Sequence, residues 1–199
     1  MPTPARTVVR LLLNGDHVTL ADEQGSLRIG IDLDVRDQVL HGHMLIADVL
    51  LFLHADTRLP VKFQEPVHRT LASPGVAAGA FRLRIDADGL GLRIIEQAAN
   101  WRSRFLQMPY GDQALFLRRD TFWGLGGFPS FPIMEDFEFI RRLKRKGRIA
   151  MVPDSVLTSP RRWLRVGVGK TWLINQAIIA AYFMGAPPER LAAWYRKKT

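Results

Sequence analysis

The apolar and polar positions predict several strands in the first half of the chain. Residues 7–16 (TVVRLLLNGD) contain a short apolar run, and residues 27–35 (LRIGIDLDV) alternate apolar and polar positions with a period of two. That alternation is typical of a strand with one buried face. Residues 47–56 (ADVLLFLHAD) hold a continuous apolar run instead, which predicts a strand covered on both faces. Residues 76–86 (VAAGAFRLRID) predict a further strand.

Helical spacing appears in the second half. Residues 89–106 predict a helix, and their apolar positions are Leu90, Ile94, Ile95, Ala98, Trp101 and Phe105. Residues 134–147 begin with acids and end with bases, which matches the helix dipole, and Gly147 suits the end of that helix. Residues 113–128 predict a short strand and then a turn into glycines, and residues 148–159 predict a last strand.

The order of these elements predicts an α/β fold. Strands and helices alternate between residues 49 and 158, which indicates a sandwich with a mixed, mostly parallel sheet. Ligands of such sheets bind beyond the carboxyl ends of the strands. Because Asp56 follows the continuous apolar strand, the fold alone predicts a ligand site at that residue.

The composition suits one globular domain. The chain has 199 residues, of which 47% are hydrophobic and 24% are charged. It has no cysteine, which excludes disulfides and thiolate metal sites. The N-terminal sequence has no long apolar stretch before a cleavage site, so we expect no signal peptide and a cytoplasmic protein.

The basic residues concentrate in the last third of the chain. Residues 141–199 hold 14 Lys or Arg against 2 Asp or Glu, a net charge of +12, whereas residues 1–140 carry a net charge of −3. Such a segment suits nucleic acid, anionic lipid or a phosphate-bearing substrate, and solvated helix faces are the alternative. We expect no nucleic-acid partner, because no helix-turn-helix, RNA-recognition or OB-type signature is present.

Two C-terminal segments predict helices, and each helix has two possible packing partners. Residues 171–185 (TWLINQAIIAAYFMG) are mostly apolar, but Asn175 and Gln176 interrupt them, and the run is shorter than the ~20 residues of a spanning helix. Residues 187–198 (PPERLAAWYRKK) are amphipathic and end with basic residues. One interpretation is peripheral contact with an anionic membrane on its inner face. The other, which we favour, is packing on the domain or on a second subunit in a homodimer.

His54 and Asp56 form the first candidate site. Two residues apart on an extended backbone, they point to the same side. A carboxylate helped by an imidazole suits a divalent ion beside a diphosphate. The alternative for Asp56 is a turn former or helix cap.

Two further acidic positions follow. Gly111, Asp112 and Gln113 form a turn before an apolar strand, where Asp112 either binds a sugar hydroxyl or caps the turn. Glu135 and Asp136 begin the helix of residues 134–147. They either stabilise the helix dipole, at about 0.3–1 kcal/mol each, or provide a general base, since crowded carboxylates hold a proton more readily.

Arg161, Arg162 and Trp163 follow the last predicted strand. Guanidinium groups suit diphosphate oxygens, and the indole ring offers a face for stacking. Binding of nucleic acid by the same residues is the competing interpretation.

Together these motifs resemble the family-2 glycosyltransferases. LLFLHADTRLP, GAFRLRID, YGDQALFLRRDTFWGLGGFP, IMEDFEFIRRLKRKGRI and SPRRW carry the resemblance, which runs from about residue 47 to residue 196. The nearest branch is that of the radical-SAM/selenodomain-associated, or arsenosugar-biosynthesis, transferases. The resemblance implies a GT-A-like, Rossmann-like fold, a nucleotide-sugar donor, an acceptor hydroxyl and a divalent metal, Mn²⁺ or Mg²⁺.

The resemblance also assigns roles to residues. His54-Ala55-Asp56 matches the D-x-D motif, so Asp56 is implied as the ligand of the metal and the diphosphate, while His54 replaces the first aspartate. Asp136 matches the base of inverting members, with Glu135 beside it. The implied donor-site residues are Arg161, Arg162 and Trp163, which match the end of a Q-x-x-R-W motif without its glutamine, and the implied acceptor-side residues are Gly111, Asp112 and Gln113.

The resemblance does not extend to the N-terminus. The V-I-P-x-L-N-E strand and the D-G-x-S-x-D motif that would bind the nucleoside are not found, and neither Asp32 nor Asp34 matches them. We expect a divergent or incomplete part in residues 1–45, a catalytic domain in residues 46–169 and a helical tail in residues 170–199. The alternatives to an active enzyme are a catalytically impaired remnant and a basic membrane-surface or interaction protein.

Overall fold

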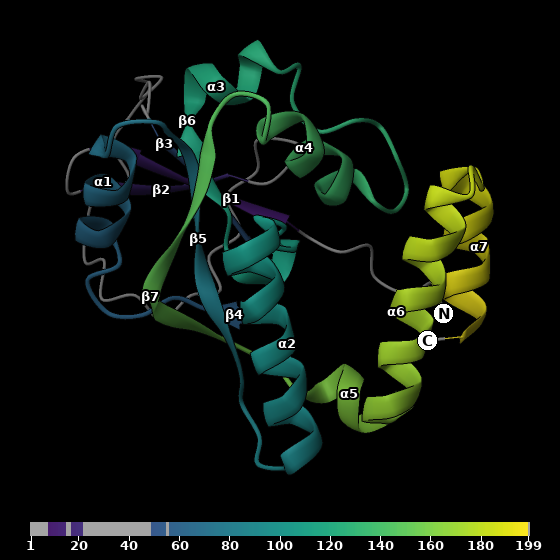
Figure 1. Cartoon of the computed structure of the whole chain (residues 1–199). Coiled ribbons are helices and arrows are strands. Elements are labelled where there is room, and N and C mark those ends of the chain that lie inside the picture. The colour runs from purple at the N-terminus through teal and green to yellow at the C-terminus, as the bar shows by residue number, and fades with distance from the viewer. Residues whose placement is uncertain (1–7, 15–16, 22–48, 55, 199) are drawn as a thin grey trace.

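The computed structural model describes residues 8–14, 17–21, 49–54 and 56–198 (Figure 1). Seven strands form one mixed sheet in the order β2-β1-β3-β6-β5-β7-β4. The strands are β1 (Val8–Asn14), β2 (His17–Ala21), β3 (Val49–His54), β4 (Thr57–Arg58), β5 (Val76–Ile85), β6 (Phe116–Arg118) and β7 (Arg148–Thr158). The helices are α1 (Gln64–Ala72), α2 (Leu90–Leu106), the 3₁₀ turn η1 (Gly111–Gln113), α3 (Arg119–Gly124), α4 (Glu135–Leu143), α5 (Arg161–Val166), α6 (Val168–Phe183) and α7 (Pro188–Lys198).

The predictions of an α/β fold and of a mixed sheet are confirmed, but the prediction that the sheet is mostly parallel is wrong. Among the described strands, β5 and β7 form the parallel pair, and each of the other pairings is antiparallel. The cause is the path into β6. The chain reaches the carboxyl end of β3 through η1, so β6 begins there and runs back between β3 and β5. Because β6 is antiparallel to both neighbours, β3, β5 and β7 still end at one edge of the sheet.

The predicted strands at residues 7–16, 47–56, 76–86 and 148–159 correspond to β1, β3, β5 and β7. The strand predicted at residues 27–35, with Asp32 and Asp34, lies outside the described residues. Residues 119–124, expected as a turn, form α3, and the sequence patterns missed α1, β4 and α5.

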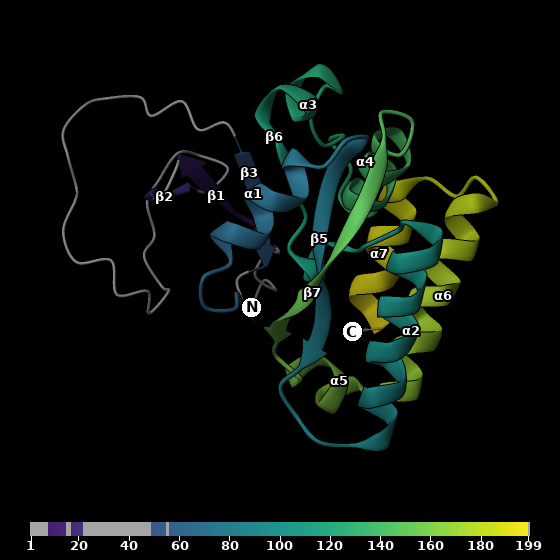
Figure 2. The ribbon, with the colours of Figure 1, turned by 60° about the vertical axis from the view of Figure 1, so that its left-hand side comes forward.

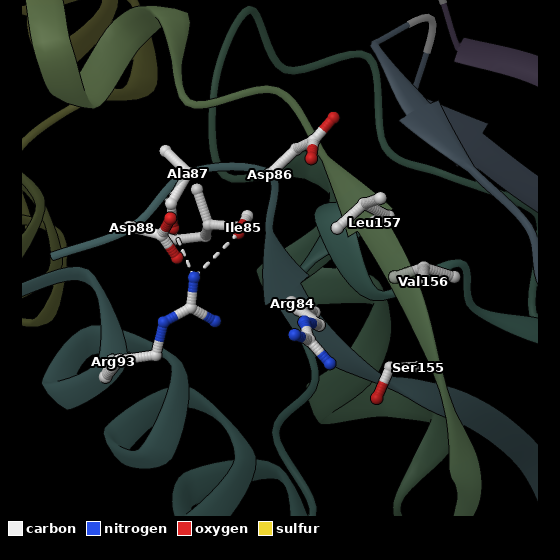
Figure 3. A pocket seen from close by; sticks show the side chains of 9 residues that line it. All are labelled: Arg84, Ile85, Asp86, Ala87, Asp88, Arg93, Ser155, Val156 and Leu157. Carbon is white, nitrogen blue, oxygen red and sulfur yellow. Dashed lines mark hydrogen bonds between the residues drawn. The ribbon is translucent and has the colours of Figure 1, made fainter.

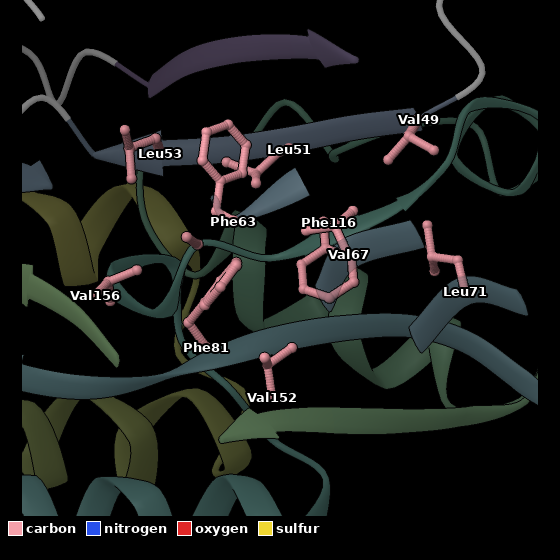
Figure 4. Close-up of a cluster of buried hydrophobic side chains, with 11 residues drawn as sticks. Val49, Leu51, Leu53, Phe63, Val67, Leu71, Phe81, Phe116, Val152 and Val156 are labelled. Carbon is pink, nitrogen blue, oxygen red and sulfur yellow. The ribbon is translucent and has the colours of Figure 1, made fainter. Parts of the chain in front are cut away.

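The continuous apolar run of β3 is covered on both faces, as predicted. Val49, Leu51 and Leu53 pack with α1 and with Phe81 and Phe116 in one cluster (Figure 4). Leu50 and Phe52 point to the opposite face and join a second cluster, which α3 and α4 contribute to. Alternate residues of an extended strand point to opposite faces, so each face of β3 needs an apolar cover. The core of the domain therefore lies on both sides of this strand.

Helix α2 covers an open edge of β5. Only Ala78 and Gly79 pair with β6, so the rest of that edge of β5 needs other hydrogen-bond partners. Asn100 provides them for Leu83, because its side-chain amide donates to Leu83 O (3.0 Å) and accepts from Leu83 N (2.8 Å). Two residues further along β5, Ile85 N donates to a Glu96 carboxylate oxygen of the same helix.

The apolar positions that predicted α2 are mostly on its exposed face. Its buried residues are Leu92, Glu96, Ala99 and Ser103. Its exposed apolar residues include Leu90, Ile94, Trp101, Phe105 and Leu106. The bounds expected for this helix agree with the structure, yet the face that packs against β5 is partly polar, because β5 presents an edge rather than an apolar surface.

The two C-terminal helices pack on the rest of the domain. Ile178 of α6 and Leu191 of α7 share a buried cluster with Met134 and Phe137 at the start of α4. No helix among the described residues is long and apolar enough to cross a membrane. The expected boundary before residue 170 falls inside α6, which begins at Val168.

Candidate functional site

Three of the predicted motifs meet at Gly111. Gly111 N donates a hydrogen bond of 2.9 Å to Asp136 Oδ2. A Cβ atom at Gly111 would lie 2.5 Å from His54 Nε2 and 3.1 Å from Asp136 Oδ2. The end of β3, the turn η1 and the start of α4 therefore converge at a glycine, whose missing side chain leaves room for the imidazole of His54 and the carboxylate of Asp136.

The Asp136 carboxylate is oriented by two backbone donors. Besides Gly111 N, Phe137 N donates to Asp136 Oδ1 at 2.7 Å. Asp136 is half-buried in the first turn of α4, next to Glu135, which begins the helix. Each carboxylate oxygen accepts one of these bonds and keeps capacity for another. The arrangement holds the group in one orientation and leaves it able to accept a proton.

Two non-glycine residues with left-handed backbones flank this point. Met134, just before α4, has φ 69°, and Ala114, just after η1, has φ 46°. Such conformations cost residues with a Cβ about 1–3 kcal/mol and persist where surrounding packing imposes them. Both residues are buried. The packing thus imposes the two turns that bring Gly111 and Asp136 together.

Gln113 anchors the turn rather than facing a ligand. Its side chain is 0% exposed. Its amide donates to Phe81 O (3.2 Å), and its Oε1 lies 2.6 Å from Ser103 Oγ. These bonds tie η1 to β5 and to α2. Gln113 therefore fixes the position of Gly111, and of the residues that Gly111 contacts.

Arg102 and Tyr110 also belong to this site, although no sequence pattern singled them out. The Arg102 guanidinium lies 3.4 Å from the centre of the Tyr110 ring, and Arg102 Nε donates to Met108 O (2.9 Å). Burial lowers the pKa of Arg102, while the charges of Tyr110, Asp112 and Asp136 act in the opposite direction. The pKa of Tyr110 is raised, mainly by burial. Arg102 is thus a half-buried positive charge close to Asp112 and Asp136. Nothing in the spacing of α2 distinguished it from the neighbouring arginines.

Asp112 is half-buried, and its Oδ1 is a buried acceptor without a hydrogen-bond partner among the described residues. The Arg102 charge acts on it. A buried carboxylate oxygen without a hydrogen bond destabilises the folded state. The positive charge of Arg102 offsets part of this cost for Asp112.

Asp56 and the start of α5 form a second group at the same edge of the sheet. Ser159 N donates to Asp56 O at 3.0 Å, and Ser159 Oγ accepts a bond of 3.3 Å from Arg161 N. The side chains of Asp56 and Arg161 are exposed. Ser159 thus connects the backbone of Asp56 to the backbone of Arg161. The side chains of both residues are open to solvent.

The other residues expected on the donor side lie closer to the C-terminal helices. Arg162 donates to Asn175 Oδ1 of α6 at 3.0 Å, and its guanidinium lies 4.7 Å from the centre of the Tyr195 ring of α7. Trp163 is half-buried in α5. The structure thus joins Arg162 to the packing of α5, α6 and α7.

The described part of the chain contains no group of three His, Cys, Asp or Glu side chains that would enclose a metal ion. Asp56 is a single exposed carboxylate. Mg²⁺ commonly binds one or two carboxylates together with phosphate oxygens of a substrate rather than an all-protein cage. Asp56 alone would therefore hold a divalent ion only together with other oxygens, such as those of a diphosphate.

A separate pocket of about 590 Å³ lies beside the carboxyl end of β5 (Figure 3). Arg93 donates to Ile85 O (3.2 Å) and to Ala87 O at its wall. Asp86, also in the lining, forms an ion pair with Arg58. None of the candidate site residues named from the sequence lines this pocket.

Comparisons of the chain with protein-family models, with curated proteins and with solved structures found no match.

Proposed function

We propose that this chain is a metal-dependent, inverting glycosyltransferase with a GT-A-like fold. It would transfer a sugar from a nucleoside-diphosphate donor to an acceptor hydroxyl. The observation that carries the proposal is the convergence of His54, Gly111 and Asp136 from three separate motifs. The resemblance of these motifs to the family-2 glycosyltransferases gives the chemistry.

Asp136 is the proposed general base. It takes the proton from the acceptor hydroxyl as that oxygen attacks the anomeric carbon, and the bond from this carbon to the diphosphate oxygen breaks. Gly111 N and Phe137 N orient the carboxylate for this step. Attack from the side opposite the leaving group inverts the anomeric centre. Gln113, Arg102 and Tyr110 act on this reaction by fixing η1 and balancing charge.

Asp56 and Arg161 are the proposed donor-side residues. Both side chains are exposed at the carboxyl edge of the sheet, where a diphosphate is able to reach them. A divalent ion bound to Asp56 and the diphosphate would stabilise negative charge on the leaving group. The guanidinium of Arg161 would bind phosphate oxygens directly. For Arg162 and Trp163 we propose a supporting role through α5.

One observation favours a second candidate, a catalytically impaired relative. β1 and β2 form an antiparallel hairpin, and β1 pairs antiparallel with β3. The resemblance implies strand–helix units that bind the nucleoside in this place. A chain without them would keep the base and lose affinity for the donor.

We further propose a peripheral position at an anionic membrane, because the last third of the chain carries a net charge of +12. This contact is independent of sugar transfer.

Donor binding and turnover of the full chain test the enzyme. UDP- and GDP-sugars with Mn²⁺ are titrated by calorimetry, and release of nucleoside diphosphate is followed. We expect Asp136→Asn to retain donor binding and to slow turnover by about 10²–10⁴-fold, the usual contribution of a general base. Asp120→Asn, an exposed acid of α3, is the matched control and should keep full turnover.

Unchanged turnover in Asp136→Asn would overturn the assignment of the base. Absence of binding for every donor in a folded chain would favour the impaired relative over the enzyme.

A further inference from the structure

The outward face of α2 is an apolar stripe. Leu90, Ile94, Trp101 and Phe105 lie four, seven and four residues apart, which places them on one face of the helix. Leu90 is 78% exposed and Trp101 is 57% exposed. The Trp101 and Phe105 rings contact each other, with centroids 5.4 Å apart. The opposite face of the helix packs on β5, so this stripe faces away from the sheet.

Helix α6 adds a second exposed apolar face beside the first. Its exposed large apolar side chains, with the residue that follows it, are Trp172, Leu173, Phe183 and Met184. Figure 2 shows α6 beyond α2, and Figure 1 shows that the two helices approach each other at their N-terminal ends and diverge further along. Their N-terminal ends touch, because a Cβ at Gly91 would lie 3.4 Å from a Val168 methyl group. A helix that is apolar on all sides is normally covered on all sides.

The helices that carry these faces, and the helices next to them in the chain, are strongly basic. Helices α2, α5, α6 and α7 contain eleven Lys or Arg against two Asp or Glu, a net charge of +9. One of the two acids, Glu96, is buried and paired with Arg93. The apolar faces of α2 and α6 thus lie within a strongly basic part of the protein.

Three unpaired arginines flank the α2 stripe on its β7 side. A groove of about 650 Å³ between α2 and β7 includes Trp101, Phe105, Arg82, Arg104 and Arg148 in its lining. All three arginines are exposed, and among the described residues their guanidinium groups form no ion pair or hydrogen bond; that of Arg104 lies 5.5 Å from the centre of the Phe105 ring. Positive charges without acidic partners are available to an external anion.

We propose that the exposed faces of α2 and α6 form a docking surface for an anionic lipid bilayer. Aromatic and aliphatic side chains would enter the boundary between head groups and acyl chains, and the flanking arginines would bind lipid phosphates. The occupant is argued from charge complementarity. A second copy of this chain would bring the same positive charges against these faces, whereas an anionic bilayer matches both their apolar and their charged parts.

This proposal rests on the membrane contact proposed above and assigns it to α2 and α6. Binding of the bilayer requires neither the sugar donor nor Asp136. The full chain is mixed with vesicles of phosphatidylcholine containing 30% phosphatidylglycerol, or with phosphatidylcholine alone, and the bound fraction is measured by flotation. We expect binding to the anionic vesicles at 0.1 M NaCl and loss of most of it at 0.5 M NaCl, because salt screens the lipid charge.

The aromatic pair of α2 is tested by Trp101→Gln with Phe105→Gln in one chain. Glutamine is a good helix former, so α2 should stay intact. We expect the vesicle partition coefficient to fall at least about tenfold. Trp123→Gln is the matched control, because Trp123 is similarly exposed, at 54%, but lies on α3. It should bind as the unaltered chain does, and circular dichroism checks that both variants are folded.

Distinct results would overturn the proposal. If the unaltered chain does not bind anionic vesicles, both the membrane contact and this surface are refuted. If the chain binds but the double variant binds equally well, the contact lies elsewhere. A dimer in sedimentation velocity that the double variant abolishes, without vesicle binding, would assign the surface to a second copy. Asp136→Asn should bind vesicles normally, which separates this test from that of sugar transfer.

Discussion

The two faces of α2 differ in a way that reverses the usual amphipathic helix. Its inner face contains Glu96, Asn100 and Ser103, each engaged in hydrogen bonds with β5, η1 or its own helix. Its outer face contains Ile94 and Trp101, which are exposed. An amphipathic helix normally turns its apolar stripe to the core. Here a partly polar face, which also contains Leu92 and Ala99, meets the protein, and the larger apolar side chains meet the surroundings.

The reason for this reversal lies in what each face contacts. The inner face meets a strand edge, where backbone N–H and C=O groups need partners. Polar side chains are the residues that satisfy such an edge, and α2 provides them at the spacing of alternate β5 residues. The outer face of α2 provides no hydrogen-bond partners to a strand edge. Its apolar residues are explained by an external partner better than by folding.

The largest effect on stability is expected on the inner face. Asn100→Ala leaves Leu83 N and Leu83 O without their partners, so the free energy of unfolding should fall by about 1–3 kcal/mol. Gln97→Ala, an exposed site of the same helix, is the control and should change it by less than about 0.5 kcal/mol. Urea denaturation followed by circular dichroism measures both. Equal losses in the two variants would show that the edge contacts contribute nothing particular.

A smaller effect is expected on the outer face. Ile94→Gln removes an exposed apolar side chain and keeps a helix former, so the free energy of unfolding should change by less than about 0.5 kcal/mol. The same denaturation experiment measures it. A loss above about 1.5 kcal/mol would mean that the stripe is part of the folded core in solution, and the contrast between the two faces would disappear.

Periodicity in the sequence predicted where strands and helices begin and end better than it predicted what each of their faces contacts. The apolar run of β3 predicted a strand covered on both faces, and packing confirms it. The spacing in α2 predicted a helix with nearly the observed bounds, but a stripe does not say which neighbour it meets. The three-residue length of β6 leaves the rest of that edge of β5 open, and no local pattern encodes where β6 pairs.

The candidate site shows the same division. His54, Gly111 and Asp136 were singled out from strand ends and a helix start, and the fold places His54 and Asp136 next to Gly111. Arg102, Tyr110 and the anchoring role of Gln113 depend on long-range packing and were not predictable from spacing. A sequence shows which polar residues stand at the ends of strands and helices. The buried residues that position them are identified only once the fold is known.

The smallest expected effect concerns the phenol of Tyr110, which lies between α2 and the site. Burial raises its pKa, although the Arg102 charge opposes this, so Tyr110 should stay protonated at about pH 10, where a free tyrosine is half ionised. The unfolded chain then releases this proton first, and the free energy of unfolding should fall as the pH rises above about 10. Tyr182 also has a raised pKa, from burial and its bond to Glu138. Titration at 295 nm of the unaltered chain minus Tyr110→Phe isolates Tyr110. A difference curve with its midpoint at or below pH 10 would contradict a buried phenol packed on Arg102.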